Sequence, residues 1–216
     1  MLERLQQQLH EIYATEAIVD VRDFLVTDAH LARAISGDNA LTRSGEALLL
    51  SEDEDGVLLS LYLDDRLFER LGSDSPEAAL QAGQLEDLCM VIEGLSHFNY
   101  VVWRANRDRS VSLLELELQA EVDKYVSTME MAREQNDTEL MTGLHARLFD
   151  NVRFHDHLSQ EQLERYRTAT EYAAHFCQGL KRGLLSSTEE TRFELRRFYR
   201  MPLGDKISHI HSCAWA

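Results

Sequence analysis

Two pairs of ionisable residues are spaced so that the members of each pair would share one side of a helix. Glu93 and His97 are four residues apart, and so are Glu117 and Glu121; this spacing makes side chains neighbours on a helix surface. A carboxylate beside a histidine is half of a metal site and also half of a general acid–base pair. If the two helices cross here, three or four ligands for zinc or another divalent metal would lie in one cleft.

A purely structural interpretation competes with the metal site. Glu121 falls inside the apolar stripe of its predicted helix, where a lone carboxylate is costly unless it is paired, binds a metal or is protonated. It could instead bond an arginine, a tyrosine hydroxyl or a helix end of a neighbour. Likewise, Glu93 and His97 could form an ordinary hydrogen bond on a helix surface. We favour this structural interpretation over catalysis.

Residues 117–125 (ELQAEVDKY) resemble a helix of the zincin metallopeptidases. In one intracellular group of that family the helix reads Glu-x-x-Ala-x-x-Phe and supplies the third metal ligand, a position that Glu117 would take. The family's first metal helix carries His-Glu-x-x-His, whereas here Ile92 precedes Glu93 and His97 lies one residue late. The resemblance therefore implies a degenerate scaffold that has lost the standard zinc site, rather than an active peptidase. A β-hairpin earlier in the chain would also suit this scaffold.

Three further groups of potential ligands carry weaker signals. Acidic residues 52–55 match no calcium-loop spacing, and His155 and His157 flank an aspartate in a predicted loop. We interpret both groups as solvated loops. His209, His211 and Cys213 alternate and would point the same way in an extended tail, but they lack a fourth ligand, so we interpret them as an accident of the tail.

Composition and charge narrow the class of protein. The chain has 216 residues, 44% hydrophobic and 28% charged, with a net charge of −16. Such an acidic protein repels nucleic-acid backbones and anionic lipids, so we expect no nucleic-acid and no membrane partner. Three scattered cysteines indicate a reducing compartment. With no signal-peptide pattern and no bilayer-length apolar run, we expect a soluble cytoplasmic protein.

The charge is distributed unevenly along the chain. Residues 179–216 hold seven basic and four acidic residues, a net +3, which leaves −19 for the rest. We favour packing of this basic segment on the acidic body. The alternatives are that the acidic surface recruits a basic partner, or that a basic helix docks a protein partner through Arg192, Arg196, Arg197 and Arg200.

Periodicity and turn residues predict the first half of the fold. Apolar residues at helical spacing predict helices over 2–12 and 15–35, although 19–26 could form a strand instead. The clearest strand signal is a hairpin near 46–63 with Asp55-Gly56 at its turn. A single hairpin is marginal in water, so it must pack on helices or pair with further strands.

The central helices are predicted over 84–135. The first of them, 84–105, is apolar on nearly all sides and is therefore expected to be buried, although its aromatic part 98–105 could be a strand. Ser112 and Glu115 fit a capping box that starts the next helix.

The remaining patterns predict helices over 159–200 and a loosely ordered tail over 205–216. We therefore expect a single domain over 1–204 with a mostly α-helical α+β fold, in which a β-hairpin or small antiparallel sheet packs on a helical bundle. The favoured function is an acidic interaction or regulatory module without catalysis or cofactor. The alternative is a metal-dependent hydrolase that uses the Glu/His cluster, and below it a nucleic-acid mimic.

Overall fold

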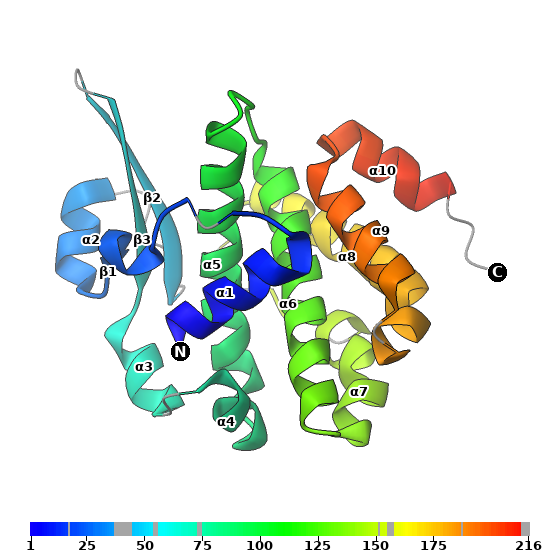
Figure 1. Cartoon of the computed structure of the whole chain (residues 1–216). Helices are drawn as coiled ribbons and strands as arrows, with labels where there is room; N and C mark the ends of the chain where they lie inside the picture. Colours follow the sequence, from blue (N-terminus) through cyan, green and yellow to red (C-terminus); the bar gives the residue numbers. More distant parts are fainter. Residues whose placement is uncertain are drawn as a thin grey trace.

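The computed structural model describes residues 1–16, 18–36, 45–53, 56–72, 75–150, 152–154, 158–186 and 188–212. They form a mostly helical α+β fold, as the sequence predicts, with a small sheet beside a helical bundle (Figure 1). In chain order the elements are α1 (Leu2–Tyr13), η1 (Val21–Phe24), β1 (Leu25–Val26), α2 (Ala29–Ser36), β2 (Glu46–Asp53), β3 (Gly56–Leu63), α3 (Asp65–Leu71), α4 (Pro76–Gln81), α5 (Leu85–Ala105), α6 (Leu113–Glu134), α7 (Thr138–His145), η2 (Ala146–Asp150), α8 (Gln160–Ser186), α9 (Glu189–Arg200) and α10 (Leu203–Ser212).

The sheet has three strands in the order β1-β3-β2. β2 and β3 form the predicted antiparallel hairpin, while β1 pairs with β3 in parallel, so the sheet is mixed rather than purely antiparallel. Alternate side chains of β3 point to opposite faces of the sheet. Leu61 and Leu63 lie against α5, whereas Tyr62 packs with Ala32 of α2. The sheet thus lies between α2 and α5, and it fixes β2 beside the central helix (Figure 1).

α5 is the buried central helix that the sequence predicts. It runs without interruption through 98–105, so the strand alternative for this segment is wrong. Phe98 and Tyr100 are fully buried because α1, α6 and the sheet cover different sides of the helix. α6 begins at the predicted cap, where the hydroxyl of Ser112 accepts a hydrogen bond from the backbone N–H of Glu115. Side by side, α5 and α6 form the frame of the molecule (Figure 1).

The prediction of one helix over 15–35 is wrong. Two aspartates divide this segment, because each caps a new helical turn. Asp20 accepts a hydrogen bond from the backbone N–H of Arg22 at the start of η1. Asp28 accepts from the backbone N–H groups of His30 and Leu31 at the start of α2.

The prediction of a loose tail is wrong as far as Ser212. Residues 203–212 form α10, which packs on α8. Its inner face buries Ile210 and, completely, Lys206. The sequence alone did not indicate this helix, because its buried Lys206 hydrogen-bonds Gln119, which is far away in the chain.

Candidate metal centre

α5, α6 and β2 bring four ionisable side chains together. One ligand atom each from Glu93, His97 and Glu117 lies within 4.8 Å of the others. Glu46, the first residue of β2, approaches the opposite side of the imidazole. The i, i+4 spacing on α5 and the crossing of α6 therefore place these groups as the sequence predicted, while Glu46 is an addition from the sheet.

His97 is the centre of this group. Its side chain is nearly buried, at 10% exposure. Nε2 is 3.4 Å from Oε2 of Glu117, and Nδ1 is 3.8 Å from Oε2 of Glu46. Among the described residues Nε2 has no hydrogen-bond partner. The imidazole thus faces two carboxylates over distances longer than those of well-formed hydrogen bonds.

Electrostatics follow from this crowding. Burial alone would lower the pKa of His97, but the carboxylates of Glu117 and Glu46 outweigh it and raise this pKa well above the usual value. Burial raises the pKa of Glu46. Arg165 of α8 also faces Glu117, with Nε 3.6 Å from Oε1. Pairing of opposite charges therefore holds these side chains together.

Glu121 does not join the three ligand residues. Lys124 lies between Glu121 and Glu93, with Nζ 2.8 Å from the first carboxylate and 3.0 Å from the second. This ion pair explains how the carboxylate of Glu121 can lie within an apolar stripe. Of the four residues proposed from the sequence, the structure groups Glu93, His97 and Glu117 and directs Glu121 to a cation.

The donor set fits a transition metal. Zinc bonds of about 2.0–2.1 Å to imidazole nitrogen and carboxylate oxygen put neighbouring ligand atoms of a tetrahedron about 3.3 Å apart. The 3.4 Å between His97 Nε2 and Glu117 Oε2 matches that spacing. Glu93 would need to exchange Lys124 for the metal.

One ligand residue of the centre, Glu93, also lines a hollow at the surface. Glu93 and Lys124 line a hollow of about 870 Å³ together with the start of α5 and with Arg147 and Arg153. Cys89, one turn before Glu93, also lines it, but burial raises the pKa of its thiol to about 12. His97 and Glu117 are not part of the lining of this hollow, and Cys89 is not a thiolate at neutral pH.

Gly94 allows the sheet to approach this closely. A Cβ atom there would lie 3.1 Å from the side chains of Leu61 and Leu63 and 3.3 Å from Oε2 of Glu46. An alanine at this position would require these side chains to shift by a few tenths of an ångström. Gly94 thus leaves room for Glu46 and the two leucines against α5.

A second buried polar cluster, which the sequence interpretation missed, occupies the next part of the α5–α6 interface. Asp123 accepts hydrogen bonds from Ser96 (2.6 Å), Gln119 (2.8 Å) and the hydroxyl of Tyr13. Lys206 of α10 donates to Oε1 of Gln119 at 2.7 Å. The i, i+4 pair of Gln119 and Asp123 was a visible signal, but their distant partners were not. We call these five residues the Asp123 network.

The weaker candidate ligands separate into two groups. Residues 54–55 and His155–His157 lie outside the described residues, as do the side chains of 52–53 and Cys213. His209 and His211 lie on a helix rather than on an extended tail, so the predicted alternation does not hold. His209 hydrogen-bonds Glu194, and His211 lies edge-on to Tyr172.

The four arginines of α9 that were proposed as a docking helix all have partners within the molecule. Arg192 is 3.8 Å from Glu130 and Arg197 is 3.7 Å from Glu194. The other two donate to main-chain oxygens at the end of α1: Arg196 to Ile12 and Arg200 to Ala14. The basic helix α9 therefore packs on the rest of the molecule, and two of its arginines hydrogen-bond carbonyl oxygens at the carboxyl end of α1.

Comparison of the chain with protein-family models, with curated proteins and with solved structures gives no match. Within the part of the chain that the structure describes, no helix combines the length and apolarity needed to cross a membrane. The function proposed below therefore rests on the geometry of the site.

Proposed function

We propose that this protein is an interaction module that binds a divalent transition metal, zinc foremost, between α5 and α6. His97 and Glu117 would supply two ligands and Glu93 the third. One observation carries the proposal: the buried Nε2 of His97 has no hydrogen-bond partner among the described residues, yet faces Glu117 at a ligand-to-ligand distance. The likeness of residues 117–125 to a zincin metal helix stays a prediction and agrees with Glu117 as a ligand.

The ligand chemistry selects the class of metal. Imidazole with carboxylates suits zinc and neighbouring transition metals, whereas calcium and magnesium prefer sites made of oxygen alone. Lys124 and Arg165 neutralise the carboxylates when no metal is present. We expect zinc to bind more tightly than magnesium.

Zinc titration by competition with a chromophoric chelator tests the site. We expect one zinc per chain for the wild type and at least tenfold weaker binding for His97→Gln and Glu117→Gln. At a zinc concentration about 100 times its Kd, the wild type should gain about 2.7 kcal/mol in unfolding free energy. Wild-type binding that both substitutions leave unchanged would contradict the proposal.

A second candidate is metal-dependent hydrolysis, which the hollow beside Glu93 favours. Three protein ligands leave one tetrahedral position for water, as in catalytic zinc sites. Zinc-loaded protein would then cleave members of an ester, amide and phosphoester panel, and His97→Gln would abolish that turnover. Stoichiometric zinc without turnover would leave the interaction module as the function.

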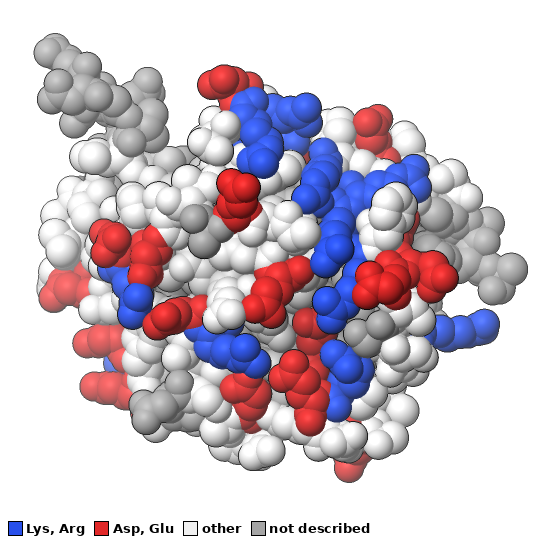
Figure 2. All heavy atoms as spheres, viewed as in Figure 1, with Lys and Arg blue, Asp and Glu red and all other residues white. Residues whose placement is uncertain are grey.

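The interaction surface that we propose is an arginine cluster formed by Arg107, Arg196 and Arg200. No ion pair among the described residues includes any of the three, whereas Arg192 and Arg197 have carboxylate neighbours. Burial and the charges of Arg107 and Arg196 lower the pKa of Arg200. A band of basic side chains crosses the face that carries α1 and α9 (Figure 2). We infer an acidic protein segment as the partner.

Binding of polyglutamate tests this surface. Arg107→Gln with Arg200→Gln should weaken binding and reduce its salt dependence, because the charges of this cluster lack carboxylate neighbours. Arg192→Gln with Arg197→Gln removes the same charge from paired positions and serves as the matched control. Equal losses in both double variants would contradict a specific surface.

A further inference from the structure

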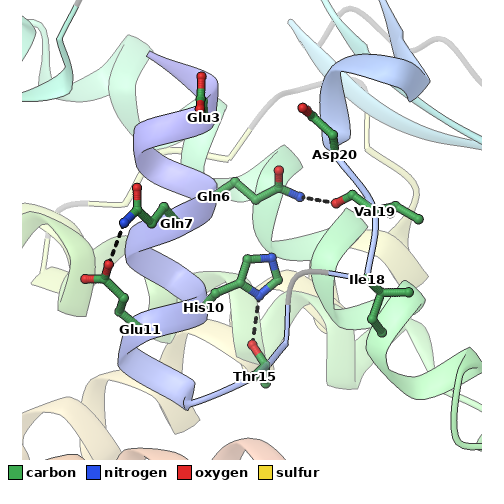
Figure 3. Close-up of a pocket in the computed structure, with 9 residues that line it drawn as sticks. All are labelled: Glu3, Gln6, Gln7, His10, Glu11, Thr15, Ile18, Val19 and Asp20. Carbon is green, nitrogen blue, oxygen red and sulfur yellow. Dashed lines mark hydrogen bonds between the residues drawn. The ribbon is translucent and has the colours of Figure 1, made fainter.

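A second hollow lies between α1 and the chain that follows it. It has a volume of about 530 Å³ and is lined by nine residues. In Figure 3, His10 of α1 lies between this helix and the segment that carries Ile18 and Val19. Nothing in the metal centre or the arginine cluster uses this hollow.

A smaller cavity beside the hollow is lined by residues that carry hydrogen-bond donors without partners. This narrow cavity of about 10 Å³ shares His10, Ile18 and Val19 with the hollow and is also lined by Glu16, Val102, Asn99 and Trp103. These last two residues are only 7% and 5% exposed. Asn99 Nδ2 and Trp103 Nε1 have no hydrogen-bond partner among the described residues. A buried donor without a partner costs about 1–3 kcal/mol, so both favour an acceptor atom in the cavity.

His10 adds a third polar atom there. Its Nδ1 is 2.8 Å from the hydroxyl of Thr15, and its buried Nε2 has no partner among the described residues (Figure 3). Burial lowers the pKa of His10. A neutral imidazole can either donate or accept through Nε2, so it adapts to the atom that enters.

The hollow itself has the opposite character. Its lining includes the carboxylates of Glu3, Glu11 and Asp20 and no lysine or arginine. Arg22, outside the lining, pairs with Glu3 and Asp20, which leaves Glu11 as the carboxylate without an ion pair among the described residues. Ile18 and Val19 line both the hollow and the narrow cavity. The narrow cavity therefore offers donors beside the carboxylate of Glu16, and the hollow next to it offers apolar contact and negative charge.

We propose that this hollow binds a small protonated amine that carries an uncharged hydrogen-bond acceptor. The acceptor, a carbonyl or hydroxyl oxygen, enters the narrow cavity and receives hydrogen bonds from Asn99 and Trp103. The ammonium group stays at the mouth near Glu11. A carboxylate in place of the neutral oxygen would be repelled by the acidic rim. One oxygen atom also suits a cavity that holds about one water molecule.

Leucinamide, which has an amine, a carbonyl oxygen and an apolar side chain, is the probe. We expect saturable binding to the wild type by NMR, with a shift of the indole N–H signal of Trp103. Isoamylamine lacks the acceptor and should bind at least fivefold more weakly without shifting that signal. The chain has two tryptophans, so Trp215→Phe assigns the Trp103 signal even if Trp103→Phe does not fold.

The variant Glu11→Gln tests whether the amine binds at Glu11 itself or responds only to the overall negative charge of the protein. It should weaken leucinamide about threefold to fivefold, while Glu139→Gln on α7 removes an exposed charge elsewhere and should change nothing. No saturation by about 10 mM leucinamide would overturn the proposal and leave a water molecule as the occupant. Equal binding of leucinamide and isoamylamine, or an indole signal that does not move, would overturn it as well.

Discussion

The metal centre and the Asp123 network lie on the same pair of helices but differ in how their polar groups meet. In the network the hydrogen-bond distances from Asp123 to Ser96 and Gln119 are 2.6 and 2.8 Å. In the metal centre His97 is 3.4 and 3.8 Å from its two carboxylates. Buried polar groups in a finished structure are normally hydrogen-bonded. The network is therefore complete without a ligand, whereas the centre has the spacing of groups that share an ion.

Loss of Asp123 should have the largest effect. Asp123→Ala removes the acceptor shared by Tyr13, Ser96 and Gln119 and takes a negative charge from the surroundings of Lys206. Removal of one buried charged partner costs about 3–5 kcal/mol, which urea denaturation would measure. Ser96→Ala, which removes one donor, should cost only about 1 kcal/mol. If the two variants lose the same free energy, the network does not act as a unit.

The pH dependence of stability should have opposite signs in the two clusters. Burial lowers the pKa of Lys206 to about 7, so the unfolded chain binds more protons above this pH and the contribution of Lys206 to stability rises with pH. The pKa of His97 is raised instead. Its contribution is complete below about pH 6.5 and is lost as pH rises through the folded-state pKa.

Urea unfolding in the presence of a chelator measures these signs between pH 7 and 9. The stability of the wild type relative to Lys206→Met should increase with pH, and its stability relative to His97→Gln should decrease. Each difference changes by at most about 1.4 kcal/mol per pH unit. The same sign for both variants would show that the clusters do not differ in the way that their geometry indicates.

Glu121 should give the smallest effect. Glu121→Gln breaks its ion pair with Lys124 but removes no ligand of the proposed centre. We expect zinc affinity to change less than about threefold, measured by the same competition titration as for Glu117→Gln. A loss as large as that of Glu117→Gln would instead restore the four-residue site predicted from the sequence.

Local patterns predicted much of the fold. The apolar surround of 84–105, the cap at Ser112 and the Asp55-Gly56 turn indicated the central helix, α6 and the hairpin correctly. The division of 15–35 follows from local caps at Asp20 and Asp28, whereas the other failures depend on contacts between distant residues. Residues 205–212 were predicted to be loosely ordered, but Lys206 there donates a hydrogen bond to Gln119, 87 residues away. β1 likewise needs β3 to become a strand.

The candidate site was predictable only where its residues share a helix. The pair of Glu93 and His97 follows from i, i+4 geometry, and Glu117 follows from a second pair. Glu46 and Arg165 could not be found in this way, because a strand and α8 bring them in. Glu121 was grouped with the other three by pattern alone, since an apolar stripe does not show that Lys124 lies within bonding distance.

The contact between the first helix and α9 has a consequence for protein synthesis. Arg196 donates to the backbone of Ile12, 184 residues earlier, and Arg200 to that of Ala14. At roughly 5–20 residues per second, the end of α1 waits about 10–40 s on the ribosome for these donors. Tyr13, which stacks on Tyr199, waits as long. The end of the amino-terminal helix therefore gains these contacts only after the last part of the chain has emerged, later than its contacts with α5 and α6.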